Sequence, residues 1–292
     1  MPVVRRLLVA DLLLLVLTAG CGTSSSGPSA ADTSPDRSAS PSSPAAPPVP
    51  GLEAEVVRLR TDEAAGGRVQ VRITATGGAS FRVTAVRLDS AGFEPVPVTV
   101  VEASFEPGRT IDLPTPVGGP VCAATPLPAV AEVTVVRPDG RAEDVRAPLD
   151  AAVLERIHAE ECAARAVLEV AEIGMAGLRE DGDALRGELT LSRRSGSEPV
   201  TVRRLGRSVL LAAEAEGLPV ELTGGGPGVS VPVTFTPATC DAHVLAETKQ
   251  PYVFPLAVTV GDAPEVSLDL PLDDDARALL AALVQRVCAQ GR

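Results

Sequence analysis

The sequence predicts a mainly β protein made of two tandem β-sandwich domains, each of which ends in an α-helix held by a disulfide. Three observations predict this fold. Short segments of alternating apolar and polar residues recur along the chain, which is typical of half-buried strands. A set of sequence landmarks occurs twice in the same order. Each copy then ends in a segment that has the apolar spacing of a helix and contains a cysteine.

Length and composition agree with this prediction and argue against several functions. With 292 residues, 45% of them hydrophobic, the chain is long enough for about two domains with buried cores. A formal net charge of −12 argues against a nucleic-acid-binding protein, because little would neutralise phosphates. Aromatic residues make up 2% and there is no Trp, so we expect no site built from aromatic faces. With only two His, no metal site and no cofactor is expected.

Residues 1–20 have the pattern of a secretory signal peptide. Arg5 and Arg6 supply the positive start, and an apolar stretch over residues 7–19 follows, interrupted by Asp11. This stretch is shorter than the roughly 20 apolar residues that span a bilayer. We therefore expect it to direct export and not to form a membrane-spanning helix.

The end of this stretch, Leu-Thr-Ala-Gly-Cys at residues 17–21, resembles the lipobox of bacterial lipoprotein precursors. The resemblance implies cleavage before Cys21 and attachment of diacylglycerol, with acyl chains such as palmitate, to its thiol. The lipid bilayer is then a partner, and the protein lies on the extracytoplasmic face of the cell membrane. Thr18 departs from the pattern, because leucine is commonest at that place. The alternative is an ordinary signal peptide with Cys21 as a spare thiol.

Residues 21–50 are expected to form a disordered linker that begins at the lipidated cysteine. The segment is rich in Ser, Pro and Ala and has no apolar periodicity, so it cannot form a core. Such a segment acts as a tether between the membrane and the folded part of the chain.

The rest of the chain contains an internal repeat with an offset of about 120 residues. Four landmarks occur twice in the same order: residues 83–88 match 200–205, Cys122 matches Cys240, residues 148–150 match 271–273, and Cys162 matches Cys288. The offset drifts slowly, as insertions in loops would cause. We therefore expect two homologous domains, over residues 51–164 and 165–292.

Each copy is expected to contain about seven short strands separated by Gly- and Pro-rich turns. The expected strands of the first copy lie near residues 53–60, 69–73, 81–85, 95–101, 109–113, 133–135 and 144–147. Those of the second copy lie at residues 166–173, 184–192, 199–205, 218–222, 229–236, 252–260 and 265–270. This number and length of strands is typical of an immunoglobulin-like sandwich, although the core Trp of antibody domains is absent.

A helix is expected at the end of each copy. Asp273 is a suitable N-cap for the second helix, whose apolar residues recur at spacings of three and four: Leu279, Leu280, Leu283, Val284, Val287 and Cys288. The first helix is expected to start at Asp150 and is less purely apolar. Its matching residues are Val153, Leu154, Ile157, His158, Glu161 and Cys162.

Four cysteines remain once Cys21 is assigned to lipidation, and four cysteines allow three pairings. The repeat selects Cys122 with Cys162 and Cys240 with Cys288, so that each domain has one disulfide that holds its terminal helix. Such bonds require an oxidising compartment, in agreement with an export signal. A zinc site is the alternative use of four cysteines, but no CxxC or His-paired spacing occurs.

Asp241 and His243, followed by Glu247 and Lys249, are the best candidate polar site. One interpretation is a metal or acid/base site in which Asp241 and His243 act as ligands or base. The other is a solvated loop after a disulfide, in which these side chains serve a turn. The matching place in the first copy, after Cys122, has no such groups, which favours the second interpretation.

The pattern Cys-Asp-x-His at residues 240–243, with Phe-Pro-Leu at 254–256, resembles uncharacterised secreted proteins of high-GC Gram-positive bacteria. The resemblance covers about 50 residues and implies no known activity.

The sequence therefore predicts a non-catalytic binding or scaffold module at the cell surface, with a cell-envelope protein as a further partner. Two alternatives stay open. One is a solute-binding lipoprotein, which would need alternating strand–helix units. The other is a secreted hydrolase that uses Asp241, His243 or Glu247, although no nucleophile-elbow motif occurs.

Overall fold

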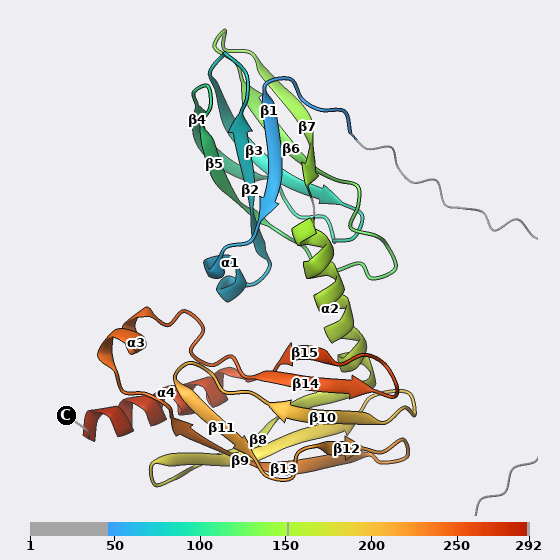
Figure 1. Cartoon of the computed structure of the whole chain (residues 1–292), viewed down its shortest axis with the longest axis vertical. Helices are drawn as coiled ribbons and strands as arrows, with labels where there is room; N and C mark the ends of the chain where they lie inside the picture. The colour runs from blue at the N-terminus through green and yellow to red at the C-terminus, as the bar shows by residue number, and fades with distance from the viewer. Residues whose placement is uncertain (1–45, 151, 291–292) are drawn as a thin grey trace, which may run out of the picture. The chain divides into compact units, whose positions relative to one another are not determined.

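The structure is a computed structural model that describes residues 46–150 and 152–290 (Figure 1). Within these residues the chain is mainly β, with strands β1 to β15 and helices α1 to α4. The signal segment, Cys21 and nearly all of the linker expected over residues 21–50 lie outside the described residues. None of the described helices is both long enough and apolar enough to cross a membrane.

The first half of the described chain forms one seven-stranded sheet with the order β4-β3-β6-β7-β1-β2-β5. Neighbouring strands are antiparallel except β1 and β7, which are parallel. The elements are β1 (Leu52–Val57), α1 (Arg60–Ala65), β2 (Arg68–Ala75), β3 (Phe81–Ser90), β4 (Thr99–Phe105), β5 (Thr110–Pro116), β6 (Ala129–Val136) and β7 (Ala142–Asp150).

The second half forms two four-stranded sheets, with the orders β12-β10-β14-β15 and β11-β13-β9-β8. Its elements are α2 (Ala152–Val170), β8 (Ala171–Asp181), β9 (Ala184–Arg193), β10 (Val200–Leu205), β11 (Leu211–Ala215), β12 (Val220–Leu222), β13 (Gly228–Pro237), α3 (Ala242–Glu247), β14 (Pro255–Val260), β15 (Val266–Asp269) and α4 (Asp274–Gln290).

Each antiparallel pairing of the first half has a counterpart in the second half. β1–β2 and β2–β5 match β8–β9 and β9–β13, while β3–β4, β3–β6 and β6–β7 match β10–β12, β10–β14 and β14–β15. Two features differ. The second half has the additional strand β11, and only the first half has a parallel pair that links its two layers.

The core of the first half comes from the alternating residues that the sequence singled out. Val71, Ile73, Val83 and Val135 are fully buried, and Val133 is nearly so. Stacked rings of Phe81 and Phe105, 4.9 Å apart between centroids, fill one end of this cluster. The period of two therefore places these side chains on the inner face of the sheet.

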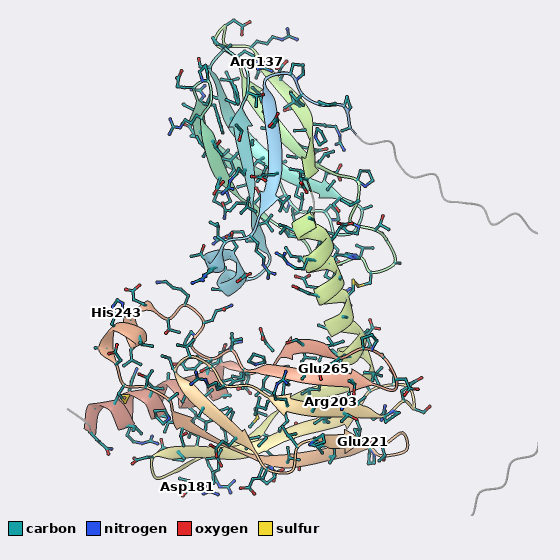
Figure 2. All side chains as sticks on the ribbon, viewed as in Figure 1. Arg137, Asp181, Arg203, Glu221, His243 and Glu265 are labelled. Carbon is teal, nitrogen blue, oxygen red and sulfur yellow. A yellow bond between two sulfur atoms is a disulfide. The ribbon has the colours of Figure 1, made fainter. Side chains whose placement is uncertain are left out.

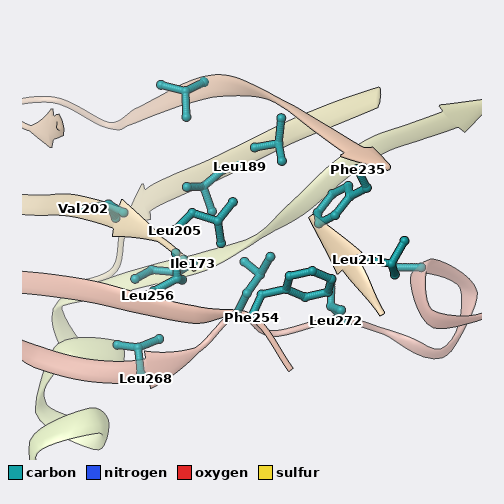
Figure 3. Close-up of a cluster of buried hydrophobic side chains, with 14 of the residues drawn as sticks. Ile173, Leu189, Val202, Leu205, Leu211, Phe235, Phe254, Leu256, Leu268 and Leu272 are labelled. Carbon is teal, nitrogen blue, oxygen red and sulfur yellow. The ribbon is translucent and has the colours of Figure 1, made fainter. Parts of the chain in front are cut away.

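The core of the second half contains the larger cluster shown in Figure 3. Leu189 and Phe235 come from one sheet, and Val202 and Leu256 come from the other. The rings of Phe235 and Phe254 meet edge to face at 5.0 Å between centroids. Helix α4 adds Leu280 and Leu283, both fully buried, to the same cluster.

The disulfide prediction is confirmed: Cys122 is bonded to Cys162, and Cys240 is bonded to Cys288. Cys122 lies in the β5–β6 connection and Cys240 in the corresponding connection after β13, while their partners lie in α2 and α4. The cap prediction for α4 also holds, because Oδ1 of Asp273 accepts a hydrogen bond from the Ala276 N–H at 2.7 Å.

Two of the expected strands have different bounds in the structure. The strand expected over residues 166–173 is the end of α2 followed by β8. Val167 and Ala171 are four residues apart, a spacing that suits a helix face as well as alternating strand positions. The helix therefore continues without a break through residues 164 and 165, where the sequence placed a domain boundary. The strand expected over residues 95–101 begins only at Thr99, because Pro95 and Pro97 have no N–H to donate to a ladder.

Candidate functional site

The polar loop that follows Cys240 forms the short helix α3. Asp241 is its N-cap: one carboxylate oxygen accepts hydrogen bonds from the N–H groups of His243 and Val244, at 2.9 and 3.0 Å. This use of an aspartate satisfies backbone donors that have no partner inside the helix. The position of Asp241 is therefore explained by local structure.

The other residues predicted for this site do not converge on Asp241. His243, Glu247 and Lys249 are all exposed, and Figure 2 shows His243 on α3. In the part of the chain that the structure describes, no hydrogen bond or ion pair joins the side chains of these four residues. Nor do the described residues contain any group of three His, Cys, Asp or Glu that could hold a metal ion. The loop thus has no assembled acid/base pair or ligand set.

The first disulfide is surrounded by contacts that hold the β5–β6 connection against α2. Nε2 of His158 lies 3.2 Å from the carbonyl oxygen of Val121. The Arg165 guanidinium donates to the carbonyl oxygen of Pro120 at 3.0 Å. The His158 ring also meets the edge of Phe93, at 5.6 Å between centroids. These contacts give His158 a structural role.

Glu161, on the same helix, has a perturbed carboxyl group. Burial raises its pKa, while the positive charges of Arg58 and Arg165 partly offset this effect. Glu160 raises the pKa further because it is a neighbouring negative charge. Burial of the carboxyl therefore accounts for the direction of the shift.

A more promising feature is an apolar groove of about 870 Å³ between α2 and the β14–β15 hairpin. We call it the α2 groove. One wall contains Ala163, Ala166 and Val170 of α2, and the other contains Val260, Pro264 and Val266. Its volume lies within the range of roughly 300–1,000 Å³ that is usual for ligand sites.

Helix α2 supplies its wall through small residues at helical spacing. Ala159, Ala163, Ala166 and Val170 follow one another at intervals of four, three and four, so they share one face. The sequence contains this pattern, but it was missed because residues 166–173 were expected to form a strand. The opposite wall belongs to a turn more than ninety residues further along the chain.

The charged residues of the α2 groove are both acidic. Among the described residues that line it, Glu160 and Glu265 carry charge, and Figure 2 labels Glu265 beside β14 and β15. Glu160 lies 3.7 Å from Arg58 and 3.9 Å from Arg156, and Glu265 lies 4.0 Å from Arg204. These pairs are weak because the distances are long and both carboxylates are exposed. The three arginines are not among the lining residues, so the charges inside the groove are those of the two carboxylates.

Comparison with known proteins identifies no family. No family model matches the chain, and no curated protein matches it. Among solved structures, red sea bream transglutaminase is similar at 12% identity with a TM-score of 0.25, over 77% of this chain and 32% of that one. A protein of unknown function from Porphyromonas gingivalis W83 is similar at 13% identity with a TM-score of 0.19, over 75% of this chain and 98% of that one. At these TM-scores the likenesses carry no conclusion about fold or activity.

Proposed function

We propose that the protein is an extracytoplasmic lipoprotein, anchored through acylated Cys21, that acts as a non-catalytic binding module at the cell surface. The observation that carries the proposal is Leu-Thr-Ala-Gly-Cys at residues 17–21, preceded by Arg5, Arg6 and an apolar run. The Ser-, Pro- and Ala-rich segment that follows suits a tether between an anchor and a folded part.

The two disulfides support an exported location. Cys122–Cys162 and Cys240–Cys288 each join a helix to a connection between strands. Bonds of this type persist in oxidising compartments and are rare in the reducing cytosol of most organisms. They therefore agree with the export signal that the first 20 residues predict.

The correspondence of strand pairings supports two tandem immunoglobulin-like modules. In the first half β2 pairs with β1 and β5, and in the second half β9 pairs in the same way with β8 and β13. The remaining four strands follow the order β4-β3-β6-β7 in the first half and β12-β10-β14-β15 in the second. Two antiparallel layers of about seven strands are the defining feature of that sandwich. A fold of this kind does not determine function, so the function must be argued from the site.

The α2 groove supports binding over catalysis. It is concave and mainly aliphatic, and its polar lining residues, Glu160, Glu265 and Ser267, include no histidine to act as a base for the serine hydroxyl. Asp241, the best catalytic candidate from the sequence, is occupied as a helix cap. A binding role needs only the shape and polarity that the groove has.

The proposal is tested by labelling the full-length protein with an alkyne analogue of palmitate in a bacterial host that processes lipoproteins. We expect labelling and partition into detergent, both lost in Cys21→Ala. The matched control is Thr18→Leu, which places the commonest lipobox residue at that position and should keep the label. Intact mass should also increase by four protons on reduction, for two disulfides. An unlabelled chain released into the medium would contradict the proposed anchor.

A further inference from the structure

The α2 groove has the dimensions and polarity of a docking site for a segment of another molecule. Its α2 wall includes three alanines, which leave space where longer side chains would fill the groove. Ala166 is exposed and Ala163 is half-buried, so nothing described covers this part of the helix. Helix α2 nevertheless packs firmly on the protein, because Val167 is buried in the core of the second half. The wall is thus fixed in place while its outer face stays open.

The opposite wall is equally well supported. Val260 and Val266 are half-buried and pack against the core of the second half, while Ala263 and Pro264 form the exposed turn between β14 and β15. Strand β15 pairs with β14 over four residues, and α2 packs beside β15. Because both walls are already formed, binding of a segment does not include the entropy cost of ordering them.

Charge distinguishes among the occupants that could cover this apolar surface. The side chains of Glu160 and Glu265 are 57% and 46% exposed at the groove. A second copy of the chain, docked groove to groove, would bring these carboxylates close to their own equivalents. Like charges brought together in this way disfavour the complex. The formal net charge of −12 adds to the repulsion between copies.

The other available occupants fit less well. Residues 22–45 of this chain offer mostly Ser, Pro and Ala, with Asp32 and Asp36 against the single cation Arg37. That segment has neither large apolar side chains nor net positive charge. Lipid molecules have apolar chains, but anionic headgroups would meet the two carboxylates. A peptide that combines apolar side chains with lysine or arginine matches both the lining and the charge.

We infer that the α2 groove binds an apolar, basic peptide segment of a partner protein, with Glu160 and Glu265 contacting its cations. This inference deepens the proposed binding role and rests on it for its biological setting. Aliphatic contacts with the alanine wall supply most of the affinity, and the two carboxylates set the preference for a positively charged segment.

The test measures binding of a fluorescently labelled amphipathic peptide made only of leucine and lysine, by anisotropy, to the full chain. The same peptide with glutamate in place of lysine is the control ligand. We expect the lysine peptide to bind and the glutamate peptide not to bind. Glu265→Gln and Glu160→Gln should each weaken binding by about threefold, the usual effect of one exposed charge pair. Glu169→Gln, on α2 but outside the groove lining, changes the net charge equally and should leave binding unchanged.

A second pair of variants tests the apolar wall. Ala166→Phe fills the groove from an exposed position and should weaken peptide binding at least tenfold, a difference of about 1.4 kcal/mol. Ala152→Phe places the same ring at an exposed position of the same helix away from the groove and should bind normally. Thermal unfolding of both variants shows that each is folded.

Several results would overturn the inference. These are equal binding by Glu160→Gln and Glu169→Gln, no binding of the lysine peptide at salt as low as 20 mM, or binding unaffected by Ala166→Phe. Dimerisation in sedimentation that Ala166→Phe abolishes would assign the groove to a second copy instead. Binding to vesicles of anionic lipid, lost in Ala166→Phe, would assign it to a lipid. Acylation of Cys21 is measured on separate variants, so failure of the peptide test and failure of the anchor are distinguishable.

Discussion

Helices α2 and α4 follow the last strand of corresponding strand sets, and each carries a cysteine bonded to the corresponding connection. Helix α4 packs on β8, β9 and β13 and places its large side chains, such as Leu280 and Leu283, in one core. Helix α2 divides its contacts. Leu154 and Ile157 lie in a cluster with residues of β1 and β2, whereas Val167 lies in the core of the second half. One helix thus closes a single core, and the other contributes to two.

This difference explains why a groove lies beside α2. A helix that packs against two cores buries a different part of its surface in each of them. The part that remains packs against neither core. In α2 that surface carries Ala159, Ala163 and Ala166 and faces the β14–β15 turn. A helix can thus keep the position of its counterpart in the fold while its extension towards a second core adds a new surface.

The largest expected effect comes from removing each disulfide. The loops that the two bonds close have sequence separations of 40 and 48 residues. In the chain-entropy treatment, loops of this length give nearly equal stabilisation of about 4 kcal/mol. We expect Cys122→Ala/Cys162→Ala and Cys240→Ala/Cys288→Ala to lower the free energy of unfolding by similar amounts, measured by guanidinium denaturation. If one double variant lost more than twice as much free energy of unfolding as the other, the two helices would not be equivalent.

Leucine truncation in the two helices gives the next largest effect. Leu154 and Leu280 are both fully buried, so replacing either by alanine should cost about 3 kcal/mol. The location of the loss should differ. Hydrogen exchange should accelerate in β1 and β2 for Leu154→Ala and in β8, β9 and β13 for Leu280→Ala. Acceleration of the same amides by both variants would contradict the division into two cores.

A smaller effect is expected at the connection between the first two strands of each half. Asp62 of α1 is fully buried and accepts hydrogen bonds from the Leu59 N–H, Arg68 and Gln70, at 3.0, 2.9 and 2.8 Å. Asp62→Ala leaves these donors unpaired and should cost about 1–3 kcal/mol in urea denaturation at pH 7. The matched control is Asp183, exposed in the β8–β9 turn, where alanine should change stability by less than about 0.5 kcal/mol.

The pH dependence of this effect follows from the direction of the pKa shift. Burial raises the pKa of Asp62, but the three hydrogen bonds and the charge of Arg68 outweigh it and leave the pKa below its ordinary value of 3.8. The stabilisation is therefore complete above pH 3.8 and is lost as pH falls through the lowered pKa. The difference in free energy of unfolding between the parent protein and Asp62→Ala should therefore decrease over that range. A difference that increases on acidification would contradict a lowered pKa for Asp62.

The sequence was most informative where a pattern is local or repeated. Alternation over residues 69–73 and 81–85 predicts two strands correctly, because a period of two has few other interpretations. The repeat predicts both disulfides, because two positions that lie close together in one copy must also lie close together in the other. The cap at Asp273 also follows from local chemistry alone.

Features that depend on distant residues could not be predicted. Helix α1 has only six residues, and its aspartate is held by Arg68 and Gln70 of the following strand, outside the helix itself. The side chains of Asp241 and His243 look like a site in the sequence, but whether they converge depends on the helix that Asp241 caps. The α2 groove requires knowing that residues 263–267 lie beside the helix, which no periodicity reveals.

The position of β1 determines how the first half would respond to a pull on the chain before residue 46. β1 is hydrogen-bonded along both edges, to β2 antiparallel and to β7 parallel. A force directed along this strand stretches its ladder bonds together in shear, whereas an edge strand can be peeled away one bond at a time. β8, the counterpart of β1, pairs on one edge only. A pull transmitted from the chain before residue 46 would therefore load β1 in shear along both edges, whereas β8 has hydrogen bonds along one edge to resist such a force.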